Sequence, residues 1–245
     1  MKRKHSVSAM VAAALMLAFA ASAGAVDGTI EINQAKVLAN GGFPYVIGAG
    51  MSGSYRLTGN LSVPASVDGI DVNVDDVTID LNGFSIIGSG AGFGINSSNH
   101  QLTVENGTVT GFTGINGTAI EAGYNAIVRN VHGDSNGHGI LARDNSVIEG
   151  CTANSNNGAG IFCYGSYCLI SGNSTNSNNG GGITCMESGC AFLGNTSNNN
   201  KSYGLGAMDG TTGYSHNVLS NNNSGGAQVN NGTSMGGNLC NGSPC

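Results

Sequence analysis

The chain has 245 residues, of which 9% are charged and 42 are Gly. It carries 8 Lys and Arg against 14 Asp and Glu, and three of the basic residues lie within the first four positions. The sequence has no basic patch, which argues against nucleic acid as a partner. A chain so rich in Gly and Asn is either of low complexity or a solenoid that turns very often.

Residues 1–25 are predicted to form a secretory signal peptide. A basic start is followed by an apolar run that ends in two overlapping A-x-A cleavage sites, A-S-A at Ala23 and A-G-A at Ala25. The alternative is a membrane anchor, but the apolar run is short for a span and no other run in the chain is long enough. We therefore expect a secreted or periplasmic protein without a membrane span in its mature form. That form has five basic residues against 14 acidic ones, so an anionic polymer is a poor electrostatic match unless a cation mediates.

Residues 26–75 are predicted to be an N-terminal cap and an irregular first coil. They lack the regular spacing found later in the chain and contain Pro44 and Pro64. The segment EINQAKVL, residues 31–38, is expected to form a short amphipathic turn over the first coil. A solenoid needs such a cover because an open end exposes apolar side chains and strand edges.

The densest run of acidic residues is DGIDVNVDDVTID, residues 68–80. Strand alternation would turn Ile70 and Val72 to one face and Asp71 and Asp75 to the other. We interpret these acids as the solvated outer face of the first coils. A Ca²⁺ site on Asp71 and Asp75 is the alternative, since calcium prefers clustered carboxylates. No other cofactor is predicted.

Residues 76–235 contain an internal repeat with a step of about 22 residues. Two apolar columns and one polar column keep this step: Ile140, Ile161, Ile183, Leu205 and Ala227; Val128, Ile148, Ile170, Phe192 and Tyr214; Asn173, Asn195 and Asn217. Ile79 and Val104 continue the second column at looser steps of 25 and 24.

A unit this short, with apolar residues at every second position between Gly/Asn/Ser runs, favours strands over helices. Because one unit cannot bury its own apolar face, successive units must stack with their strands in parallel. The sequence therefore predicts an all-β, parallel β-helix of about seven coils. The Asn173 column is interpreted as a hydrogen-bonded ladder at a corner, with ligand binding as the alternative.

Acidic, basic and cationic side chains concentrate in RNVHGDSNGHGILARD, residues 129–144. His132, Asp134, His138 and Arg143 are accordingly the candidate catalytic residues. His138 occupies a variable position of the repeat, because the next two units read NGAGI and NGGGI where this one reads NGHGI. No second carboxylate is placed for hydrolysis by two carboxylates.

Six of the seven cysteines form three C-x4-C pairs: Cys163 and Cys168, Cys185 and Cys190, Cys240 and Cys245. In an exported chain we expect disulfides rather than a zinc or redox site. Bridges within each pair are favoured, while bridges between coils, 163–185 and 168–190, remain open because stacked strands lie within disulfide reach. The last pair is out of phase with the repeat and is expected to fasten a C-terminal cap, residues 236–245. Cys151 falls in the Asn column and is interpreted as a small buried residue.

The segment GSYRLTGNLSVP leading into VDDVTIDLNGFSIIG resembles the first coils of the right-handed parallel β-helix family with pectin-lyase-like architecture, of the exported bacterial type. The resemblance covers roughly residues 50–235. It implies the fold, whereas the family spans pectate lyases, polygalacturonases, alginate epimerases, adhesins, phage tailspikes and accessory proteins. The G-H-G of residues 137–139 is shared with polygalacturonases, whose other motifs are absent here.

These observations predict an exported repeat protein with a non-catalytic binding or structural role at the cell envelope. A polysaccharide or cell-surface glycan is the expected ligand, with Tyr164, Tyr167 and Tyr203 as a binding strip near one run of turns. The alternatives are a polysaccharide lyase or glycoside hydrolase that uses the 129–144 cluster, and an adhesin or assembly subunit that uses the long side of the rod.

Overall fold

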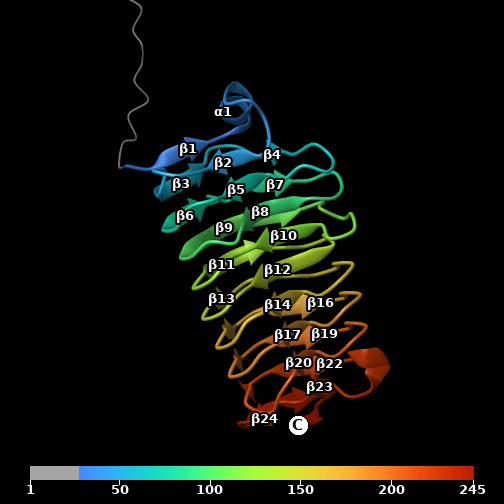
Figure 1. Ribbon diagram of the computed structural model, residues 1–245. Helices are drawn as coiled ribbons and strands as arrows, with labels where there is room; N and C mark the ends of the chain where they lie inside the picture. Colours follow the sequence, from blue (N-terminus) through green and yellow to red (C-terminus); the bar gives the residue numbers. More distant parts are fainter. Residues whose placement is uncertain (1–27) are drawn as a thin grey trace, which may run out of the picture.

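The computed structural model describes residues 28–245, so the predicted signal peptide, residues 1–25, lies outside the described residues. The described chain is a parallel β-helix in which successive coils stack from the N-terminal end to the C-terminal end (Figure 1). Helix α1, Gln34–Ala39, lies over the first coil and inserts Val37 into the core. The amphipathic turn predicted for residues 31–38 is therefore present as a short helix.

Three sheets run along the stack. The nine-stranded sheet contains β2 (Tyr45–Ile47), β5 (Ile70–Val72), β8 (Phe93–Ser97), β10 (Thr118–Glu121), β12 (His138–Ala142), β14 (Ile161–Cys163), β17 (Ile183–Cys185), β20 (Leu205–Ala207) and β23 (Val229–Asn230). The 12-stranded sheet contains β1 (Ile30–Ile32), β3 (Gly53–Leu57), β6 (Val77–Asp80), β9 (Leu102–Thr110), β11 (Ile127–His132), β13 (Val147–Glu149), β15 (Leu169–Ser171), β18 (Ala191–Leu193), β21 (Gly213–Ser215) and β24 (Thr233–Ser234), with β4 (Leu61–Ser62) and β7 (Ser85–Ile87) beside this path. The five-stranded sheet contains β16 (Ser174–Asn176), β19 (Thr196–Asn198), β22 (Val218–Ser220), β25 (Leu239–Cys240) and β26 (Ser243–Pro244).

The solenoid is longer than the seven coils predicted. Ten strands lie on the path of the 12-stranded sheet from β1 to β24, one from each coil. Parallel pairing already joins Ile30 to Tyr55 and Tyr55 to Ile79, so coils begin well before residue 76. These first coils take 24 or 25 residues, and their longer turns hide them from a search for a 22-residue step.

The observed register confirms the second apolar column without exception, from Ile79 through Val104 to Tyr214. The first column is confirmed from Ile140 to Leu205. Its last member is wrong, because Leu205 pairs with Val229 and not with Ala227. The physical reason is the 3-10 turn Asn223–Gly225, which lengthens this coil by two residues.

The Asn column is a buried hydrogen-bonded ladder, as predicted. The Asn195 side-chain amide donates to the Asn217 Oδ1 and to the Ile170 carbonyl oxygen, at 3.0 and 2.9 Å. The Asn195 backbone N–H also donates to the Asn217 Oδ1, and Asn173 makes the equivalent bonds to Asn195. Cys151 occupies the next position of the ladder, buried, with its N–H donating to the Asn173 Oδ1 at 2.8 Å.

A second ladder, which the sequence analysis missed, runs along the neighbouring corner. Its buried members are Asn136, Asn156, Asn178, Asn200 and Asn222, and it ends on Gln228. Each member directly follows a residue in the left-handed backbone region, such as Ser177 before Asn178 at φ 57°. The tight corner and the ladder are therefore one local feature: the left-handed residue turns the chain, and the Asn that follows satisfies the backbone inside the turn.

All three predicted C-x4-C pairs form disulfides within the pair. The 163–168 and 185–190 bridges close the same corner on two consecutive coils, where β14 and β17 of the nine-stranded sheet lead into β15 and β18. Ala142 and Ala207 continue this column on either side. The 240–245 bridge links the two arms of the antiparallel pair β25–β26, which forms the C-terminal edge of the five-stranded sheet.

Candidate functional site: a groove on the outer face of the nine-stranded sheet

The outer face of the nine-stranded sheet carries side chains that change from coil to coil. One column runs Asp71, Asn96, Glu121, Leu141, Phe162 and Thr184 along successive strands. A parallel column contains Phe93, Thr118 and His138. The inward residues of the same strands, such as Ile95, Ile120 and Ile140, are all buried and apolar. The repeat thus holds the core constant while the outer positions change from acidic to apolar along the rod.

Two adjoining pockets lie on this face. The first has a volume of about 400 Å³ and is lined by Phe93, Asn116, Thr118, Glu121, His138, Leu141, Arg143 and Tyr164. The second has a volume of about 360 Å³ and is lined by Tyr124, Arg143, Asp144, Tyr164, Gly165, Ser166 and Glu187. Because Arg143 and Tyr164 line both, we treat the two pockets as one depression and call it the outer groove.

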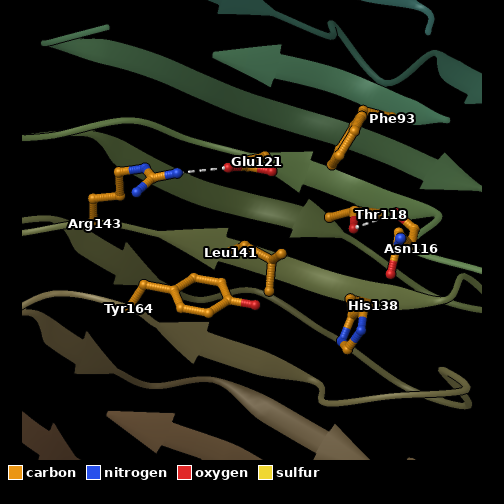
Figure 2. Close-up of a pocket in the computed structure, with 8 residues that line it drawn as sticks. All are labelled: Phe93, Asn116, Thr118, Glu121, His138, Leu141, Arg143 and Tyr164. Atoms are coloured by element: carbon orange, nitrogen blue, oxygen red, sulfur yellow. Dashed lines mark hydrogen bonds and ion pairs between the residues drawn. The ribbon is translucent and has the colours of Figure 1, made fainter. Parts of the chain in front are cut away.

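Figure 2 shows how the first pocket of the outer groove is arranged. Tyr164 and Arg143 lie on one side, His138 lies on the other, and Glu121 and Leu141 lie between them. Leu141 is 5% exposed and forms part of the floor, whereas Tyr164 is 47% exposed. The groove therefore combines an exposed aromatic ring with an apolar floor and several polar groups.

Arg143 is fixed by two neighbours in the adjacent coil. Its Nη2 lies 3.1 Å from the Glu121 Oε1, and its guanidinium carbon lies 5.7 Å from the ring centroid of Tyr124. Tyr124 in turn stacks on His100, with ring centroids 5.0 Å apart. The Nε of Arg143 is buried and has no hydrogen-bond partner within residues 28–245. The strand register places Arg143 beside Gly123, which explains why its side chain reaches both Glu121 and Tyr124.

His138 lies half-buried in the groove against the backbone of Gly158. A Cβ at position 158 would clash with the His138 ring, so this close packing requires Gly there. The backbone N–H of Ala159 donates to the His138 Nδ1 at 3.2 Å. Burial lowers the pKa of His138 below its usual 6.5, which favours the neutral ring. The Nδ1 acceptor role then leaves the proton on Nε2, so the neutral ring offers a donor at that atom.

The structure divides the four candidate catalytic residues into two separate pairs. His138 and Arg143 line the outer groove. His132 and Asp134 instead meet at the end of β11, where both contact Thr152: the His132 Nδ1 lies 2.8 Å from its hydroxyl, which donates to Asp134 at 3.2 Å. Asp134 also accepts from the backbone N–H of Asn154. This pair therefore holds a corner between two coils.

Asp71 and Asp75 have different surroundings. Strand β5 ends at Val72, so alternation does not continue to Asp75, which is exposed at the corner and accepts from the backbone N–H of His100 at 2.8 Å. Asp71 lies on the outer face, where burial, reinforced by the neighbouring Asp68 carboxylate, raises its pKa to about 6. Among residues 28–245 the single group of three potential ligands close enough for a metal is Cys163, Cys168 and Cys190, whose sulfurs are in disulfides.

The three tyrosines of the predicted binding strip lie apart. Tyr164 lines the outer groove, and Tyr203 lines a third depression of about 200 Å³ together with Thr184 and Met208. Tyr167 is exposed on a turn, over Gly189. Sequence analysis missed most of the groove, including Phe93, Glu121 and Leu141. Phe93 and Thr118 directly precede Gly-Ile and Ala-Ile, just as His138 precedes Gly-Ile. The residue at this position changes from coil to coil, and that variation was the signal that could have found Phe93 and Thr118.

Comparison with known proteins supports the fold described above. Residues 94–241 match the family model described as the right handed beta helix region. No curated protein and no solved structure gives a significant match. Among residues 28–245 no helix is long and apolar enough to cross a membrane. The matched segment covers more than half of the sequence and contains the groove strands from β10 to β17, so the chain belongs to the right-handed beta helix family.

Proposed function

We propose that this protein is exported and binds a glycan in the outer groove, in a non-catalytic role at the cell envelope. The observation that carries the proposal is the pair of adjoining pockets that share Tyr164 and Arg143. Their combined lining runs across several coils, which suits an extended chain of sugars rather than a compact molecule. The three disulfides support the exported location, because such bonds persist in oxidising compartments.

The chemistry of the lining matches that of a sugar ring. A pyranose has an apolar face that packs on an aromatic ring, and hydroxyls that need fixed donors and acceptors. Tyr164 supplies the exposed ring, and Leu141 and Phe93 add apolar surface. Asn116, the Nε2–H of His138 and the Glu121 carboxylate supply polar groups around it. An apolar surface flanked by polar groups of both kinds is typical of carbohydrate recognition.

The geometry favours binding over bond cleavage. A general base needs a free acceptor atom near the substrate, but the neutral His138 ring uses its acceptor nitrogen on the Ala159 N–H. Glu121 is engaged by Arg143. The other two candidate catalytic residues, His132 and Asp134, are bound to Thr152 outside the groove. Each of these four residues is thus engaged within the protein, which supports a binding role over hydrolysis or β-elimination.

A glycan screen on the purified protein tests the proposal. We expect binding to at least one polysaccharide, no release of reducing or unsaturated ends, and a loss of affinity of about tenfold in Tyr164→Ala, the value of one aromatic stacking contact. Tyr167→Ala is the matched control, since it removes an exposed tyrosine outside the groove. The proposal is overturned if no glycan binds, if both variants weaken binding equally, or if the bound glycan is depolymerised.

A further inference from the structure

The charges in the outer groove indicate which glycan it takes. We infer that its ligand is a cationic amino-sugar polymer, with free amines protonated, rather than a polymer of uronic acids. This inference rests on the proposed function and narrows its ligand class. Three observations support it: the excess of negative charge in the two pockets, the pairing of Arg143 with Glu121 within the protein, and the apolar surface beside the carboxylates.

The groove carries more negative than positive charge. Three carboxylates line it, from Glu121, Asp144 and Glu187, against the one cation Arg143. Glu187 is exposed at the rim of the second pocket. The mature sequence as a whole has five basic residues against 14 acidic ones, so the surroundings reinforce this sign. An anionic polymer would be repelled both at a distance and in the groove.

Arg143 does not offset this repulsion. Its guanidinium is paired with Glu121 at 3.1 Å and lies over the Tyr124 ring, so its positive charge is matched within the protein. A uronate carboxylate at the guanidinium would lie next to the Glu121 carboxylate and compete with it for the same positive charge. An ammonium group has no such cost, because Asp144 and Glu187 have no cationic partner among residues 28–245.

Hydrogen-bonding side chains continue beyond the pockets in one direction. Asp71 lies two coils before Glu121 in the same outer column, with Asn96 between them, and Asp68 lies beside Asp71. Two coils correspond to about 10 Å at the usual strand spacing, which is close to the length of two sugar units. In the other direction the column continues with Leu141 and Phe162. A polymer lying along the rod would therefore meet the Glu121 carboxylate before Leu141 and Phe162, and the Glu187 carboxylate in the coil after Tyr164.

Matched oligosaccharides separate the possible ligands. We would measure calorimetric binding at about pH 5.5 for a β-1,4-glucosamine oligomer, its fully N-acetylated counterpart and an oligogalacturonate of equal length. The first two share one backbone and differ in charge. We expect the glucosamine oligomer to bind about tenfold more tightly than the acetylated one, because its ammonium groups meet Asp144 and Glu187, and the galacturonate to bind most weakly.

Two variants place the effect in the groove. Glu187→Gln should weaken glucosamine binding about threefold, while Glu149→Gln, which removes an exposed carboxylate from the outer face of the 12-stranded sheet, should not change it. Equal affinity for the acetylated oligomer, preference for galacturonate, or displacement of the sugar by oligolysine of equal charge would each overturn the inference. The first two outcomes would leave glycan binding intact, whereas failure of every oligosaccharide to bind would overturn the proposed function itself.

Discussion

Cys151 stands where an asparagine stands in the coils that follow. Its Sγ lies 3.5 Å from the Val128 carbonyl oxygen and 3.3 Å from that of Glu149, so the thiol replaces the amide donor of a ladder residue. It is 1% exposed, and burial raises its pKa to about 11. A buried thiol with so little thiolate serves packing rather than chemistry.

The reactivity of Cys151 follows from this setting. Since a rise of two pKa units leaves about a hundredfold less thiolate, we expect Ellman's reagent to label the native protein at least about a hundredfold more slowly than the urea-unfolded protein. Unfolding without a reductant should release one thiol per chain, because the other six cysteines are in disulfides. Rapid labelling of the native protein would show that Cys151 is accessible.

Asp71 predicts a pH dependence of stability. Because its folded pKa is raised from 3.8 to about 6, the folded state holds a proton that the unfolded state releases between pH 4 and pH 6. Its contribution to the free energy of unfolding is therefore lost as the pH rises through this window. We expect Asp71→Asn to unfold at a higher urea concentration than the wild type at pH 7.5, and at nearly the same concentration at pH 4.

The difference in urea midpoint between the wild type and Asp71→Asn depends on Asp71 and not on His138. Burial lowers the pKa of His138, so its contribution is present above pH 6.5 and is lost as the pH falls, which is the opposite sign. This contribution is common to the wild type and to Asp71→Asn and cancels in the difference. A constant difference in urea midpoint at both pH values would contradict the raised pKa.

At the scale of elements, the two Asn ladders hold the corners of the solenoid. The side chains of Asn173, Asn178, Asn195 and Asn200 each donate to a carbonyl of the preceding coil and to the Asn of the following one. These bonds satisfy backbone groups that the corner removes from the sheets and buries. The ladders therefore connect coils where strand pairing is interrupted.

Removal of one ladder side chain should be costly. Asn195→Ala leaves the Ile170 carbonyl and the Asn173 N–H without partners in the interior, so we expect a loss of about 2–4 kcal/mol in the free energy of unfolding measured with urea. Asn179→Ala is the control, because Asn179 is exposed one residue after a ladder position and should cost less than about 0.5 kcal/mol. Similar losses in both variants would show that the ladder has no special role.

The 22-residue repeat made much of the fold predictable from the sequence, but not all of it. The Asn173 ladder and the disulfide corner could be predicted from a constant 22-residue step, because residues one period apart in the sequence stack on one another in successive coils. The second ladder, with Asn178 and Asn200, keeps the same step and was missed because Gly/Asn/Ser runs were taken together as turns. Residues 26–75 were predicted as a cap and a single irregular first coil, because turns of variable length leave strand pairing intact yet remove the period from the sequence.

At the scale of the whole molecule, the outer groove could be located only from the structure. Its parts come from coils 20–25 residues apart, and their contact depends on how each coil is registered on the next. Glu121 and Arg143 illustrate this, since they are 22 residues apart in sequence and form an ion pair. Sequence grouped Arg143 with His132 and Asp134 instead, because these residues are near in the chain, whereas the coil turns a corner between them.

The fold also explains why the core residues do not indicate which ligand the protein binds. Inward positions keep apolar residues in almost every coil, as stacking requires, and outward positions are free to vary. On the 12-stranded sheet the charged outward residues pair with one another, as Arg56 does with Asp80 and Arg129 with Glu105. On the nine-stranded sheet, between β8 and β17, outward residues line the two adjoining pockets of the outer groove. We therefore expect the ligand to lie on the nine-stranded sheet, across Tyr164.

Hydroxyl-radical footprinting with mass spectrometry tests that location most directly. Tyr164 and Tyr167 are both exposed, lie three residues apart and differ in that Tyr164 lines the outer groove. With a saturating glycan, we predict that oxidation of Tyr164 falls several-fold while oxidation of Tyr167 and of Met235, exposed in the last coil, stays unchanged. Unchanged oxidation of Tyr164, or protection of Tyr167 or Met235 in its place, would contradict the account.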